Sequence, residues 1–160
     1  MKKGFVFTIG LLLLVVTSFA IRSSAVAKEA IPMKGSVDVE VTYIPDLPNL
    51  RVYIQGHGTG TSTHLGKFTV HYDIVLNLQT QIGTGTATFV AANGDQLFTE
   101  NSATVSSTGN PNENRLDETY VVTGGTGRFE GASGQFGGIR LVNTVTGLSS
   151  GSFSGEISLR

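Results

Sequence analysis

The chain has 160 residues, a length that suits a single domain, and its 11 Lys and Arg against 12 Asp and Glu give a formal net charge of −1. With 39% hydrophobic and 14% charged residues it is not a disordered polyelectrolyte, and its balanced charge argues against nucleic-acid binding, which needs clustered Lys and Arg. The absence of Cys excludes disulfides, thiolate metal sites and a cysteine nucleophile.

Residues 1–27 have the pattern of a secretory signal peptide. Lys2 and Lys3 precede a stretch without charge, and the small-residue triplet Ala25–Ala27 follows. We expect cleavage after Ala27, a mature domain at 28–160 with no membrane span, and a secreted or periplasmic location in a bacterium. The alternative is an uncleaved anchor, but the apolar stretch is shorter than the roughly 20 residues that a membrane span needs.

The rest of the chain predicts β-strands. The clearest is Lys67–Leu78, in which the apolar residues from Phe68 to Leu78 alternate with mostly polar ones over twelve positions. Ala30–Pro32 is expected to be a loose lead-in, and Ser106–Leu116 an exposed loop. The other expected strands are Val37–Tyr43, Leu50–Ile54, Thr84–Ala92, Gln96–Val105, Asp117–Thr123, Gln135–Val145 and Gly151–Leu159.

About eight strands without an amphipathic helix must bury their apolar faces against one another. A closed barrel and a two-sheet sandwich both achieve this, but a twelve-residue strand, about 40 Å long, is more usual in a tilted barrel. We therefore predict an all-β fold, a single antiparallel barrel of about eight strands.

A glycine-rich segment, VVTGGTGRFEGASGQ, occupies Val121–Gln135. Glycine tolerates positive φ, so we expect a tight turn that closes one barrel end, with Phe129 as its plug. No helix pattern follows, which argues against a phosphate-binding loop. The turn motif comprises Gly124, Gly125, Gly127, Phe129 and Gly131.

This segment resembles the signature of the allene oxide cyclase and dirigent barrel superfamily, in which a strand runs into a GG-[TS]-G-x-F turn. The whole pattern, with THLGKF at 63–68 and AANGD at 91–95, is also similar to uncharacterised secreted bacterial proteins. The resemblance implies a barrel of about eight strands, often trimeric, with a cavity open at one end. It transfers no catalytic residue, because the Cys of the cyclase pocket has no counterpart here and the N-terminal pocket motif is absent.

Three functions are compatible with this sequence. The first is binding of a small, largely apolar molecule inside the barrel. The second is a cyclase or isomerase that acts through pocket shape, as the resemblance implies. The third is a structural or surface-interaction module with a fully packed barrel. A cavity lined by a buried carboxylate or His would favour the second, and a filled interior would favour the third.

Four side chains are candidates for a ligand pocket. His64 lies in a polar loop before the longest strand, and loops at barrel mouths often hold ligand contacts. Tyr72 and Tyr120 lie on predicted inner faces, where each offers a phenol. Glu100 shares a mixed face with Gln96 and Phe98, and such a face could line a cavity. We predict no metal site and no cofactor, since a spacing of seven positions does not make His57, His64 and His71 a ligand set on one strand. The alternative is a divalent metal site formed by His57, His64 and a carboxylate, which only the fold could bring together.

The exported protein should begin at Lys28, because Ala25-Val26-Ala27 satisfies the small-residue requirement of signal peptidase. The intact mass of protein recovered from the medium or the periplasm measures this directly. A mass that still includes residues 1–27 would contradict the cleavage site.

Overall fold

The computed structural model describes residues 29–160, so the predicted signal peptide at 1–27 lies outside the described residues. Within the described part, the only helical elements are two three-residue 3-10 turns, η1 (Leu47–Asn49) and η2 (Gly127–Phe129), and no helix is long and apolar enough to cross a membrane. The strands are β1 (Ala30–Asp46), β2 (Arg51–Ser62), β3 (Gly66–Asn77), β4 (Ile82–Ala91), β5 (Gln96–Ser107), β6 (Glu113–Gly125), β7 (Ser133–Asn143) and β8 (Leu148–Ser158).

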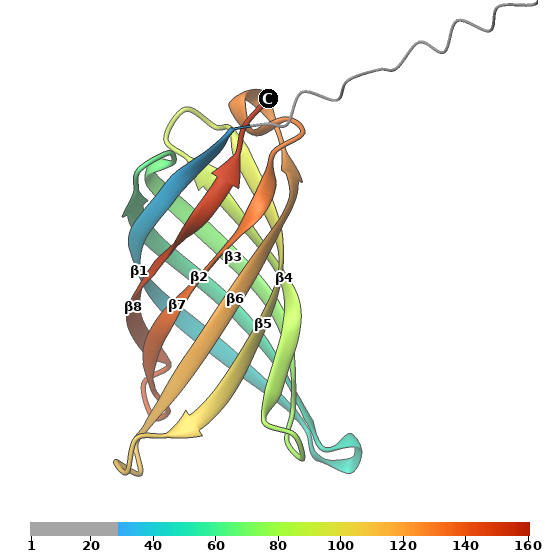
Figure 1. The fold of residues 1–160 in the computed structure, drawn as a ribbon. Helices are drawn as coiled ribbons and strands as arrows, with labels where there is room; N and C mark the ends of the chain where they lie inside the picture. Colours follow the sequence, from blue (N-terminus) through green and yellow to red (C-terminus); the bar gives the residue numbers. More distant parts are fainter. Residues whose placement is uncertain (1–28) are drawn as a thin grey trace, which may run out of the picture.

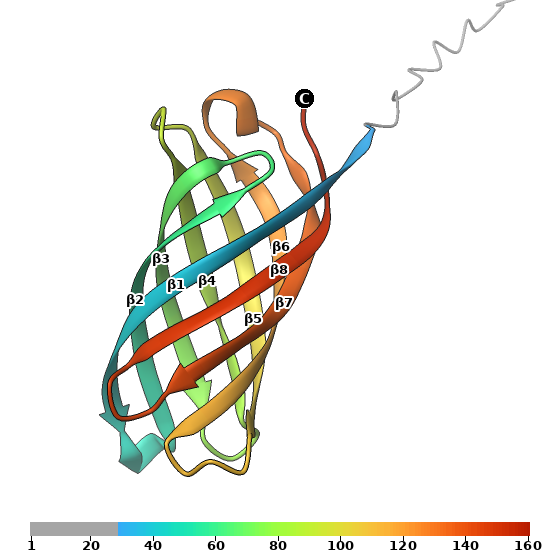
Figure 2. The same ribbon diagram turned by 90° about the vertical axis from the view of Figure 1, so that its left-hand side faces the viewer.

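The eight strands form one closed antiparallel barrel (Figures 1 and 2). Each strand pairs with its neighbours in the sequence, and β8 returns to pair with β1 from Ala30–Ser158 to Glu40–Leu148. The predicted fold class is therefore confirmed. Closure leaves no free sheet edge, and strand alternation divides every strand into an inward and an outward face.

Several elements are longer than the sequence pattern indicated. Ala30–Pro32, expected to be a lead-in, belongs to β1, where it pairs with the end of β8. β2 continues to Ser62 through the glycines at 56, 58 and 60, and the β5–β6 loop shortens to Thr108–Asn112. The sequence pattern does not reveal these strand ends, because they consist largely of glycine and polar residues with low β-propensity. They are strands because the neighbouring strands supply their pairing partners.

Aromatic side chains fill the interior in one half of the barrel. This is the half that carries the β2–β3, β4–β5 and β6–β7 connections, which lie at the top in Figure 1. Phe89 lies at the centre of this cluster, 1% exposed, with ring centroids 5.5 to 6.5 Å from those of five aromatic neighbours. Tyr120 stacks on Phe136 with centroids 5.0 Å apart and planes 12° apart. Large rings interdigitate in this half, which accounts for the dense core. The five neighbours of Phe89 are Phe68, Tyr72, Tyr120, Phe136 and Phe153.

The glycine-rich segment closes this packed end. Gly127 has φ 55° and begins η2, which turns the buried Phe129 into the barrel. Asp95, in the neighbouring β4–β5 hairpin, accepts a hydrogen bond from the Arg128 amide at 3.3 Å and lies 3.7 Å from the Arg128 guanidinium. The structure thus places Phe129 as the plug of this end.

Gly125 should tolerate no side chain. A Cβ there would lie 2.2 Å from the Gln96 carbonyl oxygen and 2.5 Å from Cβ of Phe129, neither of which can move without disturbing the barrel. We expect Gly125→Ala to lower the free energy of unfolding by about 3 kcal/mol, in the range of overpacked cores. Urea unfolding measures the loss.

Gly66→Ala is the matched control. Gly66 has φ 65° but no atom within 4 Å of its would-be Cβ, so only the left-handed strain of about 1–2 kcal/mol applies. Equal losses of unfolding free energy in the two variants would show that the close approach of Phe129 and Gln96 does not determine the cost of a side chain at position 125.

Candidate functional site

The half of the barrel opposite the glycine-rich turn is not filled. A cavity of about 90 Å³ opens there among the inward side chains. Its walls are mostly apolar, and its polar groups come from Asn101, Asn114, Glu118, Arg140 and Ser149, beside the rim residue Tyr43. Smaller inward residues on this half leave space that the aromatic cluster fills in the other. The apolar wall residues are Val41, Ile54, Ile74, Leu76, Ala103, Val105, Leu116 and Val142.

A buried ion pair lies between the cavity and the aromatic core. Nη2 of Arg140 donates to Oε1 of Glu118 at 2.6 Å, and each side chain is 7% exposed. Nη1 of Arg140 donates to Oγ of Ser149 at 3.3 Å, and that hydroxyl donates in turn to the Val39 carbonyl at 3.2 Å. Burial alone lowers the pKa of Arg140, but the Glu118 carboxylate raises it and the net shift is upward. The guanidinium therefore stays charged.

Two polar atoms at this site have no hydrogen-bond partner among the described residues. They are Oδ1 of Asn101, whose residue is 7% exposed, and Nε of Arg140, whose residue is 6% exposed. Both residues line the cavity. A buried donor or acceptor without a partner costs about 1–3 kcal/mol, so the site offers one acceptor and one charged donor to whatever enters.

The two candidate tyrosines lie under the ion pair. The Tyr120 hydroxyl donates to that of Tyr72 at 3.4 Å, and the Arg140 guanidinium lies 5.0 Å above the Tyr72 ring. Burial raises the pKa of Tyr72 to about 12, partly opposed by the charge of Arg140. Burial also raises the pKa of Tyr120, with the Tyr72 and Glu118 charges adding to it. Both phenols are therefore neutral at pH 7.

The structure separates the four predicted pocket residues. Tyr72 and Tyr120 are buried inside the barrel, on the inner faces that strand alternation predicted. His64 lies at the plugged end of the barrel, opposite the half that contains the cavity. Its Nε2 is 2.9 Å from the Pro32 carbonyl, and this contact joins the β2–β3 turn to β1. Glu100 is exposed on the outer surface, over β4 and β6, and does not face the interior.

Glu100 lies on the outer surface, and the inward face of β5 itself contains polar residues, so polarity does not distinguish the two faces of this strand. Its inward face includes the polar residues Thr99 and Asn101, and Thr99 satisfies its hydroxyl by donating to the Ala87 carbonyl at 3.2 Å. Phe98 is on the outward face with Glu100. Sequence reasoning also missed Glu118 and Arg140, although a signal was present. Glu118 lies two residues before Tyr120 on β6, and Arg140 lies four residues after Phe136 on β7. Strand alternation therefore places both charged side chains on the same inward face as these aromatic residues.

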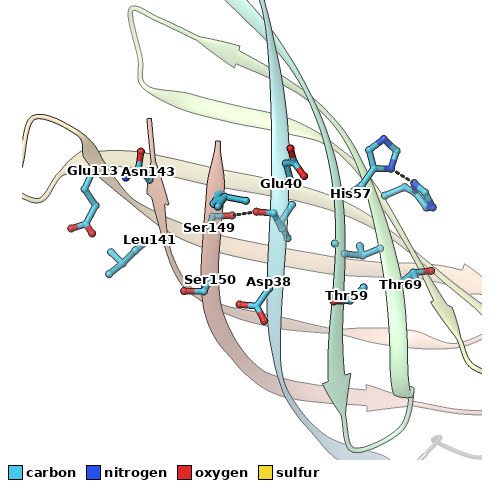
Figure 3. Close-up of a pocket in the computed structure, with 15 residues that line it drawn as sticks. Asp38, Glu40, His57, Thr59, Thr69, Glu113, Leu141, Asn143, Ser149 and Ser150 are labelled. Carbon is cyan, nitrogen blue, oxygen red and sulfur yellow. Dashed lines mark hydrogen bonds between the residues drawn. The ribbon is translucent and has the colours of Figure 1, made fainter. Parts of the chain in front are cut away.

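A second, wider hollow of about 830 Å³ lies on the outer surface and is lined by residues of β1, β2, β3, β6, β7 and β8 (Figure 3). Exposed polar side chains line it, among them Asp38, Glu40 and Ser150. It contains His57 and His71, whose Nδ1 atoms are 2.7 Å apart. In the described part of the chain, no three His, Cys, Asp or Glu side chains form a group that could hold a metal ion. We take the inner cavity as the candidate ligand site because it is the more enclosed and its unpartnered polar atoms are buried.

The buried ion pair should be costly to break from one side. Glu118→Gln leaves the charged Arg140 without its counter-ion, and we expect a loss of about 3 kcal/mol or more in the free energy of unfolding. Glu118→Gln/Arg140→Met should recover part of that loss. Chemical denaturation of both variants measures it.

Asp117→Asn is the matched control on the same strand. It neutralises the exposed Arg115–Asp117 pair, whose closest atoms are 2.7 Å apart, and should leave the unfolding midpoint unchanged. A Glu118→Gln variant as stable as this control would show that the Glu118 carboxylate does not stabilise the buried charge of Arg140.

Comparisons with known proteins support the fold. No family model and no curated protein matches the sequence. Among solved structures, the chain is similar to the pterocarpan synthase dirigent protein GePTS1, with a TM-score of 0.54 and 14% sequence identity. The match covers 89% of this chain and 98% of that one. The chain therefore has a dirigent-like closed barrel of eight strands.

Proposed function

We propose that this protein binds a small, largely apolar molecule with one hydrogen-bonding polar group in the open half of its barrel. The observation that carries the proposal is the pair of unpartnered buried atoms, Oδ1 of Asn101 and Nε of Arg140, beside a cavity with apolar walls. A ligand hydroxyl can donate to the first atom or accept from the second, and its apolar part replaces water along the walls. Binding then removes the free-energy cost of leaving these two buried atoms without hydrogen-bond partners.

The size of the cavity limits the ligand. Pockets for drug-sized molecules usually have about 300–1,000 Å³, whereas this one has about 90 Å³. A single-ring molecule or a short chain fits this limit, with any larger part extending past the rim near Tyr43, which is 38% exposed. A barrel packed throughout would support the structural-module alternative, but only the half around Phe89 is packed in that way.

A second candidate function is a cyclase or isomerase that acts through pocket shape. One observation favours it, namely the buried carboxylate of Glu118 at a cavity with two neutral phenols below it. The solved neighbour is itself named a synthase. Arg140 engages one oxygen of Glu118, so catalysis would depend on the other oxygen or on polarisation by the guanidinium. Turnover that is lost in Glu118→Gln while ligand binding persists would distinguish this function from binding alone.

Export and self-association complete the proposal. The signal-peptide pattern at residues 1–27 supports a secreted or periplasmic bacterial protein. Cleavage after Ala27 would leave the whole barrel intact, because β1 begins at Ala30. Assembly into a homo-oligomer, a trimer by resemblance to the dirigent and cyclase barrels, is supported by exposed apolar residues on the outer face of β7 and the start of β8. These are Ile139, Leu141 and Leu148.

Phenol and toluene test the ligand site, since they have nearly the same shape and differ by a hydroxyl in place of a methyl. We expect phenol to bind at least about fivefold more tightly in an NMR titration, because toluene leaves the buried polar atoms unpaired. Asn101→Leu should remove most of this preference. Native mass spectrometry of the protein from its own host would reveal any co-purifying molecule.

Ala103→Phe and Ser102→Phe form the matched pair for the location. Ala103 lines the cavity, whereas its neighbour Ser102 is exposed on the outer surface. Phenol binding should be lost in the first variant and kept in the second. Binding that survives Ala103→Phe would place the phenol site outside the barrel.

A further inference from the structure

The outer surface brings together two histidines that are fourteen residues apart in the chain. His57 on β2 and His71 on β3 are direct cross-strand partners, both exposed. Their Nδ1 atoms lie 2.7 Å apart, with ring centroids 4.7 Å apart and planes at 84° (Figure 3). Direct cross-strand pairing holds the two side chains on one side of the sheet, so this contact depends on strand register.

The contact requires exactly one proton between the two nitrogens. One Nδ1 must donate and the other must accept, because two N–H groups would repel and two lone pairs would not bond. The pair thus holds two imidazole nitrogens in contact at the surface. Two such nitrogens can supply two of the ligands of a divalent transition metal, which would take the place of the shared proton.

We propose that His57 and His71 form a surface site for a divalent transition metal of the imidazole-binding class, such as Cu²⁺, Zn²⁺ or Ni²⁺. With metal–nitrogen bonds of about 2.0–2.1 Å and tetrahedral geometry, the two nitrogens need a separation of about 3.3 Å. Small side-chain rotations open the present 2.7 Å to that value, since neither ring is buried. The ring that donates must shift its proton from Nδ1 to Nε2 to free the Nδ1 lone pair, so both imidazoles remain neutral ligands, and water completes the metal's coordination.

The charges around the pair favour a dication. Glu40 on β1 is the direct cross-strand partner of His57, so both side chains lie on the outer face of the sheet. Asp73, two residues after His71 on the same face of β3, accepts a hydrogen bond from Gln55 at 3.2 Å. Asp38 lines the same hollow. These carboxylates raise the local cation concentration, and the hollow leaves room for the metal's water ligands.

Isothermal titration of the untagged protein with ZnCl₂ tests the site, and the EPR spectrum of bound Cu²⁺ reports how many nitrogens coordinate it. We expect one metal per chain and two-nitrogen coordination. His57→Ala and His71→Ala should each weaken binding by at least about tenfold, because each removes a direct ligand. Bound Zn²⁺ should also raise the melting temperature of the parent protein, because the metal joins β2 to β3.

His64→Ala is the matched control, since it removes the remaining histidine, whose ring contacts the Pro32 carbonyl at the plugged end. It should bind Zn²⁺ as the parent does. Unchanged affinity in His57→Ala and His71→Ala, one-nitrogen coordination of Cu²⁺, or the absence of binding at millimolar Zn²⁺ would each overturn the proposal. Circular dichroism shows whether each variant keeps the barrel, as the exposure of both rings predicts.

Discussion

Antiparallel pairing of β1 with β8 turns the sheet into a barrel, and it determines how the interior is filled. The pairing closes the barrel from Ala30–Ser158 to Glu40–Leu148, so every strand has two neighbours and an enclosed inner face. An enclosed face must be filled by side chains, bound molecules or water. Here the two halves are filled differently, with aromatic rings around Phe89 in one half and smaller aliphatic residues in the other. The cavity follows from that difference and needs no special loop.

The Arg140–Glu118 pair lies where the two halves meet. A charged pair inside an apolar barrel gives little net stability, because desolvation of both groups opposes their attraction. Its position is better explained by what it presents to the cavity. Nη2 and Nη1 are engaged by Glu118 and Ser149, which fixes the guanidinium and leaves Nε unpartnered. The pair therefore orients a charged donor while neutralising most of its charge, a suitable arrangement for a ligand that is polar at one point only.

Strand alternation predicted the fold and the inward position of some side chains, since both can be inferred from one strand at a time. It placed Tyr72 and Tyr120 inside, and the glycine-rich turn marked the end that Phe129 plugs. The mixed face that Glu100 shares with Gln96 and Phe98 suggests a cavity lining, yet the polar Thr99 and Asn101 are inward residues of β5. The ion pair depends on the relative positions of β6 and β7, where Arg140 lies opposite Leu116, two residues from Glu118. No single strand contains that information.

The histidines show how register turns a weak sequence signal into a specific one. Taken along the chain, the spacing of seven residues from His57 to His64 and from His64 to His71 suggests no shared site. In the hairpin, His64 lies at the turn between β2 and β3, so residues equally far from it on either side become partners. The equal spacing that argued against a metal site along one strand is therefore the condition for a cross-strand pair. His64, at the centre of that symmetry, is directed to the Pro32 carbonyl and lies apart from both rings.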